Sequence, residues 1–221
     1  KCMAPVNGIP FIHFIVAYLK RAGIEKFIFS LGYKNEIITD YLDKIFEGTD
    51  KKYVIETELL GTGGAIKKAI GTAESENVIV VNGDTLFNID ISRLSDLHEK
   101  KQGDCTLALK EMINFSRYGS VEILLDGSIR AFHEKKFCDK GYINGGVYAL
   151  NIGRFLIDAL PDVFSFEKWR EENTIAKKLY GEVYQNYFID IGIPEDYQRF
   201  TNDYTQLLSG NQINESSFSK T

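Results

Sequence analysis

Apolar and polar residues follow two different periods along the first half of the chain. Apolar side chains recur every three or four positions at 9–22 and 34–47, which is the spacing of one helix face. The unbroken apolar run KFIFSL, at 26–31, is instead typical of a short buried strand. The same criteria predict strands at 53–57 and 78–84 and helices at 65–73 and 92–101. This alternation predicts a mostly parallel sheet with helices on both faces.

The second half begins with short apolar stretches at close spacing, which predict an antiparallel lobe. Strands are expected at 104–110, 119–125, 128–135 and 141–150. Asp126-Gly127 stands between two of them as a hairpin turn. A helix at 165–180, a strand at 182–191 and a helix at 194–208 complete the prediction. The expected fold class is therefore α/β, with a mixed, mostly parallel sheet flanked by helices and an added antiparallel lobe.

The order of the elements also predicts how the chain is organised. Residues 1–205 are expected to form a single domain, and residues 206–221 a polar tail with few apolar anchors. A helix that opens an alternating pattern normally follows an earlier strand. We therefore expect a first strand, and the loop that leaves it, to precede residue 1.

Composition narrows the class of protein. Hydrophobic residues make up 44% and charged residues 26%, the balance of a soluble globular domain. No apolar run approaches the ~18 residues that a membrane span needs. A net charge of −5 without basic clusters argues against a nucleic-acid partner. Cys2, Cys105 and Cys138 have the spacing of neither a disulfide framework nor a metal site, so the cytoplasm is the expected location.

The segment VIVVNGDTLF carries the strongest local signal for a ligand site. Its apolar residues predict a buried strand, and Asn82, Gly83 and Asp84 follow at the carboxyl end. Ligands of open α/β sheets bind outside the carboxyl ends of strands. A carboxylate there suits Mg²⁺, which takes one or two protein oxygens together with substrate phosphates. The alternative is that Asp84 only caps a turn.

A second predicted strand also ends in an aspartate. In YFIDIGIPEDY, Asp190 follows an apolar strand, and Pro194 marks the expected start of a helix. Asp84 and Asp190 can therefore meet across the sheet and share one metal ion. Two separate surface caps are the alternative.

Glycines follow another predicted strand in ETELLGTGGAIKKA. Gly61, Gly63 and Gly64 precede a helix whose N-terminal N–H groups can bind an anion, and glycine lets a backbone approach a ligand closely. The spacing is neither that of the dinucleotide-binding fingerprint nor that of the P-loop, so neither mechanism transfers. A plain turn is the alternative explanation.

Charged and amide side chains mark the ends of the antiparallel strands. Glu134 and Lys135 close the strand that contains FHEK, where the lysine can meet a phosphate and the glutamate can accept a hydroxyl hydrogen bond. Asn144 and Gly145 can bring polar groups close to a sugar. A solvated charged edge is the alternative. The scattered histidines form no dyad for nucleophilic catalysis.

Motifs taken in order along the chain resemble a known family. The strings K-x-M-x-P-V-x-G-x-P, LGTGGA, VNGD, FHEK, INGGVY and FIDIGIPEDY are similar to those of the sugar-1-phosphate nucleotidylyltransferases. Together they cover residues 1 to about 202. The resemblance implies a Rossmann-like, glycosyltransferase-A-like fold. Within the family, LGTGGAIK and FIDIGIPEDY are most similar to the branch that uses GTP and a manno-configured heptose 1-phosphate.

The resemblance implies a role for each matched residue. Lys1 is similar to the lysine that ends the family's glycine-rich signature and contacts phosphate; the glycine-arginine part of that signature is expected before it. The implied nucleotide-binding residues are Lys1, Glu58, Gly61, Thr62, Gly63, Gly64, Asn82 and Gly83. The implied Mg²⁺ ligands are Asp84 and Asp190, which form the catalytic set with Lys1. The implied sugar-phosphate contacts are Glu134, Lys135, Asn144 and Gly145.

The implied reaction joins a nucleoside triphosphate to a sugar 1-phosphate and releases pyrophosphate, for surface polysaccharide or glycoprotein synthesis. Residue chemistry does not select the base, so a uridylyltransferase or a mannose 1-phosphate guanylyltransferase remains an alternative. Outside the enzymes, the alternative is a regulatory subunit that binds a nucleotide sugar without turnover. A dehydrogenase is disfavoured, since the dinucleotide fingerprint is missing. The chain is also a candidate homo-oligomer.

Overall fold

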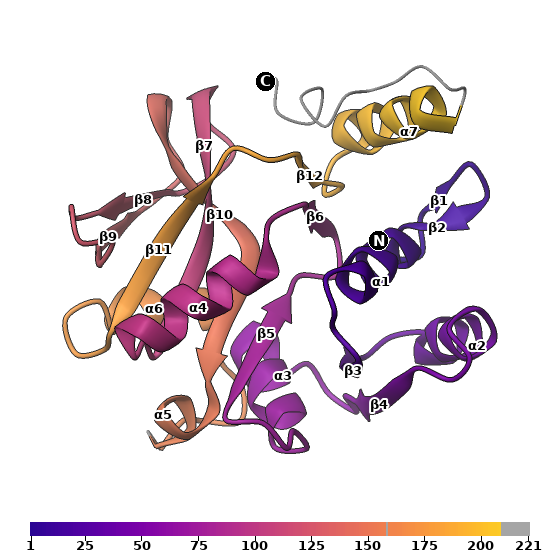
Figure 1. Cartoon of the computed structure of the whole chain (residues 1–221), viewed down its shortest axis with the longest axis horizontal. Helices are drawn as coiled ribbons and strands as arrows, with labels where there is room; N and C mark the ends of the chain where they lie inside the picture. The colour runs from indigo at the N-terminus through magenta and orange to yellow at the C-terminus, as the bar shows by residue number, and fades with distance from the viewer. Residues whose placement is uncertain (158, 209–221) are drawn as a thin grey trace.

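The computed structural model describes residues 1–157 and 159–208. The helices are α1 (Phe11–Arg21), α2 (Asn35–Ile45), α3 (Gly61–Ile70), α4 (Ile91–Lys101), α5 (Ile152–Leu156), α6 (Phe166–Glu172) and α7 (Pro194–Leu208). The strands are β1 (Pro5–Val6), β2 (Ile9–Pro10), β3 (Lys26–Leu31), β4 (Asp50–Ile55), β5 (Asn77–Val81), β6 (Thr85–Phe87), β7 (Cys105–Phe115), β8 (Ser120–Ile123), β9 (Ile129–His133), β10 (Cys138–Asn151), β11 (Leu179–Tyr184) and β12 (Phe188–Asp190). Figure 1 shows helices packed around the sheets that these strands form.

The largest sheet has six strands and is built around β10. Its order is β11-β7-β10-β8-β9, and β5 pairs with the C-terminal part of β10. The other described strands form the two-stranded pairs β1–β2, β3–β4 and β6–β12. In Figure 1, β6 and β12 lie between the large sheet and the helices α1 and α7.

The predicted α/β class, a mixed sheet flanked by helices with an antiparallel lobe, is confirmed. Parallel pairing is less common than predicted, because among the described strands only β3–β4 and β7–β11 are parallel. The long strand β10 is the reason: it enters from the antiparallel lobe and runs antiparallel to β5, β7 and β8. Within the described residues, β3 pairs only with β4 and β5 only with β10. The strand expected before residue 1 stays a prediction.

Two apolar clusters form the core. The first contains Phe11 and Leu42, both fully buried, and extends to Ile189 of β12. The second packs Phe166 and Trp169 of α6 against the apolar side chains of β7 and β10. The pair β6–β12 therefore rests on the first cluster, and the antiparallel lobe rests on the second.

Three predicted elements differ from those in the structure in regions that bear on the site. Helix α3 begins at Gly61 rather than at 65, so the glycines belong to its first turn. The predicted helix at 165–180 ends at Glu172, because LYGEVY pairs in parallel with β7 as strand β11. The predicted strand at 182–191 is accordingly split between β11 and β12. The final helix, α7, has the predicted bounds. Of the predicted polar tail, residues 209–221 lie outside the described residues.

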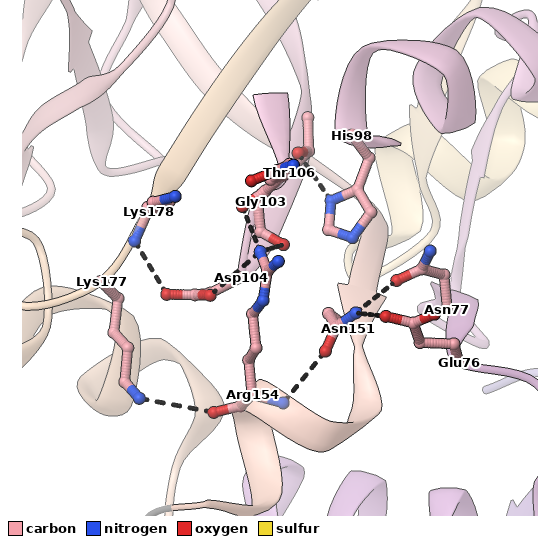
Figure 2. Close-up of polar contacts among 11 residues, drawn as sticks. Glu76, Asn77, His98, Gly103, Asp104, Thr106, Asn151, Arg154, Lys177 and Lys178 are labelled. Carbon is pink, nitrogen blue, oxygen red and sulfur yellow. Dashed lines mark hydrogen bonds and ion pairs between the residues drawn. The ribbon is translucent and has the colours of Figure 1, made fainter. Parts of the chain in front are cut away.

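A polar cluster fixes the end of the large sheet where β5 begins. Figure 2 shows Asn151, Asp104 and Arg154 in this cluster. The amide nitrogen of Asn151 donates to Asn77 Oδ1 at 2.9 Å, and Asp104 Oδ2 accepts from the backbone N–H of Lys178 at 2.9 Å. Arg154 Nη1 lies 3.7 Å from Asp104 Oδ1. These contacts tie β5, β7, β10 and β11 together at the end opposite to Asp84, which follows β5.

Candidate active site

Asp84 and Asp190 lie on neighbouring segments of backbone. Asp84 directly precedes β6, and Asp190 ends β12. The two strands pair antiparallel with Asp190 opposite Thr85. The N–H of Ile191 donates a hydrogen bond of 3.0 Å to the carbonyl oxygen of Asp84. Residues far apart in the sequence are thus brought to one end of a strand pair. That they share a metal ion stays a prediction.

Among the described residues, each aspartate has one hydrogen-bond or ion-pair partner, so carboxylate oxygens remain able to accept. Lys1 Nζ lies 3.5 Å from Asp84 Oδ2, and both side chains are partly exposed. Asp190 Oδ1 accepts a hydrogen bond of 2.8 Å from the N–H of Gly192. An ionised carboxylate has about four lone-pair directions. The predicted catalytic residues Lys1 and Asp84 are therefore in contact, and Asp190 stands beside them on the paired strand.

Arg117 and Tyr118 border Asp190 and were not predicted from the sequence. The ring of Tyr118 packs edge-to-face on Phe188, with ring centres 6.1 Å apart. Burial, and then the charge of Asp190, raises the pKa of Tyr118 to about 12. Arg117 Nη1 donates to Asp196 Oδ2 at 2.5 Å. Tyr118 is thus a neutral phenol near the carboxylate, and RYG ahead of a strand was too short a signal to reveal it.

A register shift in β10 shapes the INGG segment. The pairing of β10 with β7 slips between Asn144 and Tyr148, which is a β-bulge. Gly146 has φ +72°, a conformation that favours glycine, and its N–H donates to Asn144 Oδ1 at 3.0 Å. The carbonyl oxygen of Gly146 accepts from the N–H of Asn82 at 2.9 Å. The bulge therefore fixes the Asn144 amide and joins it to the loop that carries Asp84.

Gly145 is buried inside this bulge. A Cβ atom at Gly145 would lie 2.2 Å from the ring of Phe87 and 3.0 Å from the carbonyl oxygen of Ala108. Packing therefore explains this glycine without a ligand. Its neighbour Asn144 donates from Nδ2 to the hydroxyl of Tyr148 at 2.6 Å. The predicted sugar contacts of both residues stay predictions.

Glu134 and Lys135 are exposed and follow β9 directly. His133, the last residue of β9, pairs with Ser120, and Ser120 pairs with Ile143 of β10. Asn144 is the next residue along β10. The strand register therefore places the charged pair and Asn144 at the same end of the antiparallel lobe, as the predicted sugar-phosphate set requires.

The glycines of LGTGG pack against a neighbouring segment. The N–H groups of Gly63 and Gly64 both donate to the carbonyl oxygen of Phe164, at 2.9 and 3.4 Å. A Cβ atom at Gly63 would lie 2.3 Å from the Phe164 ring, and one at Gly64 would lie 2.1 Å from the Asp162 carbonyl oxygen. These two glycines are buried, whereas Gly61 and Thr62 are exposed. Close chain packing thus accounts for Gly63 and Gly64, and their N–H groups are already satisfied.

Thr62 links helix α3 to helix α6 through hydrogen bonds. Its hydroxyl donates to Glu167 Oε2 at 2.6 Å and accepts from the N–H of Phe166 at 2.9 Å. Burial opposes the ionisation of Glu167, but hydrogen bonds from Thr62, from its own backbone N–H and from Ser165, together with the charge of Arg170, outweigh it and lower the pKa of this carboxyl. The phenyl ring of Phe166 lies 5.2 Å from the ring of Tyr148. Helix α6 therefore contacts both helix α3 and the bulged strand β10. This role of α6 was not predicted from the sequence.

The remaining predicted nucleotide contacts, Glu58, Asn82 and Gly83, are exposed. Gly83 lies beside Cys2, with 3.9 Å between the Cβ position of the glycine and Cys2 Cβ. The loop after β5 is thus in contact with the first residues of the chain, next to the Lys1–Asp84 ion pair.

The donor set at the strand pair fits a hard divalent cation. Within residues 1–157 and 159–208, no group of three or more His, Cys, Asp or Glu side chains is arranged to hold a metal ion. The site instead offers the carboxylates of Asp84 and Asp190. Mg²⁺ is commonly bound through one or two carboxylates, with water and substrate phosphates completing its shell. The residues present therefore fit a metal that arrives with a nucleotide.

Comparison with known proteins gives the class to which this sheet architecture belongs. Residues 1–206 match the model of the family described as "Nucleotidyl transferase". The chain belongs to this family. No described helix is long and apolar enough to cross a lipid bilayer.

Individual relatives and a solved structure show which members of the family the chain resembles. The chain is 46% identical to D-glycero-α-D-manno-heptose 1-phosphate guanylyltransferase of Aneurinibacillus thermoaerophilus, over 90% of this chain and 86% of that protein. Identity is also 46% to the enzyme of the same name from Campylobacter jejuni, over 90% of this chain and 88% of the relative. The crystal structure of HddC from Yersinia pseudotuberculosis complexed with GMP-PN has a TM-score of 0.80 and 34% identity, covering 92% of this chain and 89% of that one.

Proposed function

We propose that this protein is a sugar-1-phosphate nucleotidylyltransferase that couples GTP to D-glycero-α-D-manno-heptose 1-phosphate. The products are the GDP-sugar and pyrophosphate. The relatives that carry this name are 46% identical to the chain, and they support both the base and the sugar. The observation that carries the proposal is the pairing of β6 with β12, which sets Asp190 beside Asp84 and the ion-paired Lys1.

The reaction is an in-line displacement at phosphorus. A phosphate oxygen of the sugar 1-phosphate forms a bond to the α-phosphorus of GTP. The bond from that phosphorus to the oxygen bridging to the β-phosphate breaks, and pyrophosphate leaves with the electron pair. The attacking phosphate is already an anion, so no side chain has to remove a proton from it. Catalysis of this kind depends on positioning and on stabilising negative charge.

The chief obstacle is repulsion between two anions. At 4 Å, two like unit charges repel by roughly 4 kcal/mol at an effective dielectric constant near 20. Lys1 lies beside Asp84 and offsets charge on the nucleotide phosphates, and Lys135 offsets charge on the sugar phosphate. Asp84 and Asp190 would hold the divalent cation, with Mg²⁺ as the proposed ion. Bound there, Mg²⁺ supplies Lewis-acid stabilisation of the phosphoryl oxygens.

The bulge in β10 and helix α3 would form the two sides of the substrate site. Asn144 presents its amide on the lobe that carries Glu134 and Lys135, and this lobe would bind the sugar phosphate. Glu58, Gly61, Thr62, Asn82 and Gly83 would line the nucleotide side. Gly63 and Gly64 support that side by packing, since their N–H groups bond to Phe164.

The test is pyrophosphate release from a panel of substrates in the presence of Mg²⁺. The four ribonucleoside triphosphates are each combined with heptose 1-phosphate, mannose 1-phosphate and glucose 1-phosphate. We expect the highest kcat/KM with GTP and the heptose 1-phosphate. Preference for UTP, or for mannose 1-phosphate, would revise the substrate. Binding of a nucleotide sugar without release from any pair would support the regulatory alternative and contradict the proposal.

A further inference from the structure

Arg170 of α6 is a buried cation in an apolar setting. Its residue surface is only 3% exposed. The guanidinium carbon lies 5.1 Å from the ring centre of Phe132, 5.1 Å from that of Tyr148 and 5.2 Å from that of Phe166. The side chain is therefore surrounded by aromatic faces, which attract a cation through the ring quadrupole.

Two nitrogen atoms of this cation lack the hydrogen-bond partners that buried arginines normally have. In the part of the chain that the structure describes, neither Nε nor Nη1 of Arg170 has a hydrogen-bond acceptor, and both atoms are buried. Glu167, on the same helix, is a carboxylate whose charge interacts with that of Arg170, although no described carboxylate lies within ion-pair distance of it. Arginine remains charged at any ordinary pH. Burying two N–H groups of a cation without acceptors is unfavourable for folding, so the packing contacts alone do not explain this residue.

The aromatic rings come from the segments that carry the substrate contacts. Phe132 stands just before Glu134 and Lys135. The hydroxyl of Tyr148 accepts the hydrogen bond from Asn144 Nδ2 at 2.6 Å. The backbone N–H of Phe166 donates a hydrogen bond to the hydroxyl oxygen of Thr62, in helix α3. The rings around Arg170 thus connect strands β9 and β10, which carry or precede the proposed sugar-phosphate contacts, with helix α3, which carries proposed nucleotide contacts.

We infer that Arg170 is a positioning residue for the sugar 1-phosphate. It orients the ring of Tyr148, which is hydrogen-bonded to Asn144, and the ring of Phe132, two residues before Glu134, so that these groups converge on one ligand. This inference rests on the proposed function and adds to it a residue that touches neither reacting phosphate. The unpartnered N–H groups identify it as a site where stability is given up for geometry.

Arg170→Met tests the role, because methionine keeps the apolar contacts and removes the charge. We expect the KM for heptose 1-phosphate to rise about tenfold, as misplaced binding groups predict. The KM for GTP should stay within about twofold. The melting temperature should not fall, since an apolar side chain replaces a buried cation that has two unsatisfied N–H groups. Arg170→Lys retains a cation and should recover part of the lost affinity for the sugar phosphate.

The matched control is Arg93→Met. Arg93 also stacks on a tyrosine, with its guanidinium carbon 5.0 Å from the Tyr184 ring, but it is exposed and its Nε lies 2.7 Å from Glu182 Oε1. This change should alter neither KM. Tyr148→Phe offers a second route if Arg170→Met does not fold. It removes the acceptor for Asn144, so it should raise the KM for the sugar phosphate, and it should be non-additive with Arg170→Lys.

Two results overturn the inference. One is an Arg170→Met protein with wild-type KM values. The other is a loss of melting temperature with equal rises in both KM values, which would indicate a purely structural arginine. Calorimetric titration with heptose 1-phosphate provides the same comparison without turnover. If the wild-type protein binds this sugar phosphate but does not turn over, the proposed function fails while the role of Arg170 in binding is still measured. If the wild-type protein neither binds nor turns over this compound, both fail.

Discussion

Replacing Gly64 with alanine separates two explanations of the LGTGG segment. If the glycine is there for chain packing, a Cβ atom would lie 2.1 Å from the carbonyl oxygen of Asp162 and 3.0 Å from Leu60 Cβ. The nearest atom belongs to the backbone, so no side-chain rotation relieves the contact. Overpacking of this kind costs about 1–3 kcal/mol. Alanine returns about 0.4–1 kcal/mol by restricting the unfolded chain.

The net expectation for Gly64→Ala is a loss of about 1–2 kcal/mol of unfolding free energy. In a domain of this size, that corresponds to a fall of about 2–8 °C in Tm. Gly71→Ala, at the other end of the same helix, is the control. Gly71 has φ −60°, and its Cβ position is 3.4 Å from the nearest atom, so alanine should be neutral or stabilising there.

Differential scanning calorimetry and urea unfolding measure these changes, and steady-state kinetics with GTP measure the site. The packing explanation requires Gly64→Ala to lose stability while Gly71→Ala does not. A Gly64→Ala protein with wild-type Tm and a raised KM for GTP would refute it, because the glycine would then serve the approach of the nucleotide.

Three further predictions concern charge. Asp84→Asn should reduce kcat by at least about a hundredfold at unchanged Tm, since it removes a metal-binding charge; near-normal pyrophosphate release would contradict its role. Lys135→Ala should raise the KM for the sugar 1-phosphate with little change for GTP, whereas unchanged sugar affinity would exclude this contact. Burial, and then Arg154, lowers the pKa of His98 below its ordinary 6.5. The unfolded chain therefore binds the proton first, and stability should fall as the pH drops below about 6.5; urea titrations at pH 7.5 and 5.5 should show a smaller difference in His98→Leu.

Hydrophobic periodicity predicted most of the fold because long amphipathic helices have an unambiguous spacing. Helix α7 at 194–208 and strand β3 at 26–31 have the predicted bounds. Periodicity failed at LYGEVY, where a short apolar stretch continues the pattern of α6 but pairs with β7. It also failed to show that β10 runs antiparallel to β5, since that choice depends on contacts between distant segments.

The same contrast holds for the candidate site: the sequence indicated some of its residues and gave no signal for others. Asp84 and Asp190 were visible because each follows an apolar strand, and strand ends gather at one edge of a sheet. Tyr148, Glu167 and Arg170 were not visible. A tyrosine inside a strand and charged residues on a short helix look like ordinary core and surface positions. Only packing brings Tyr148 to Asn144, Glu167 to Thr62 and Arg170 to the aromatic rings.

The central claim is that Asp84 and Asp190 hold one divalent cation between them. The direct measurement is anomalous diffraction from crystals grown with Mn²⁺ and a non-hydrolysable GTP analogue. We expect a manganese peak bonded to carboxylate oxygens of both Asp84 and Asp190 and to phosphate oxygens of the nucleotide. A peak bonded to the nucleotide with either aspartate turned away would contradict it.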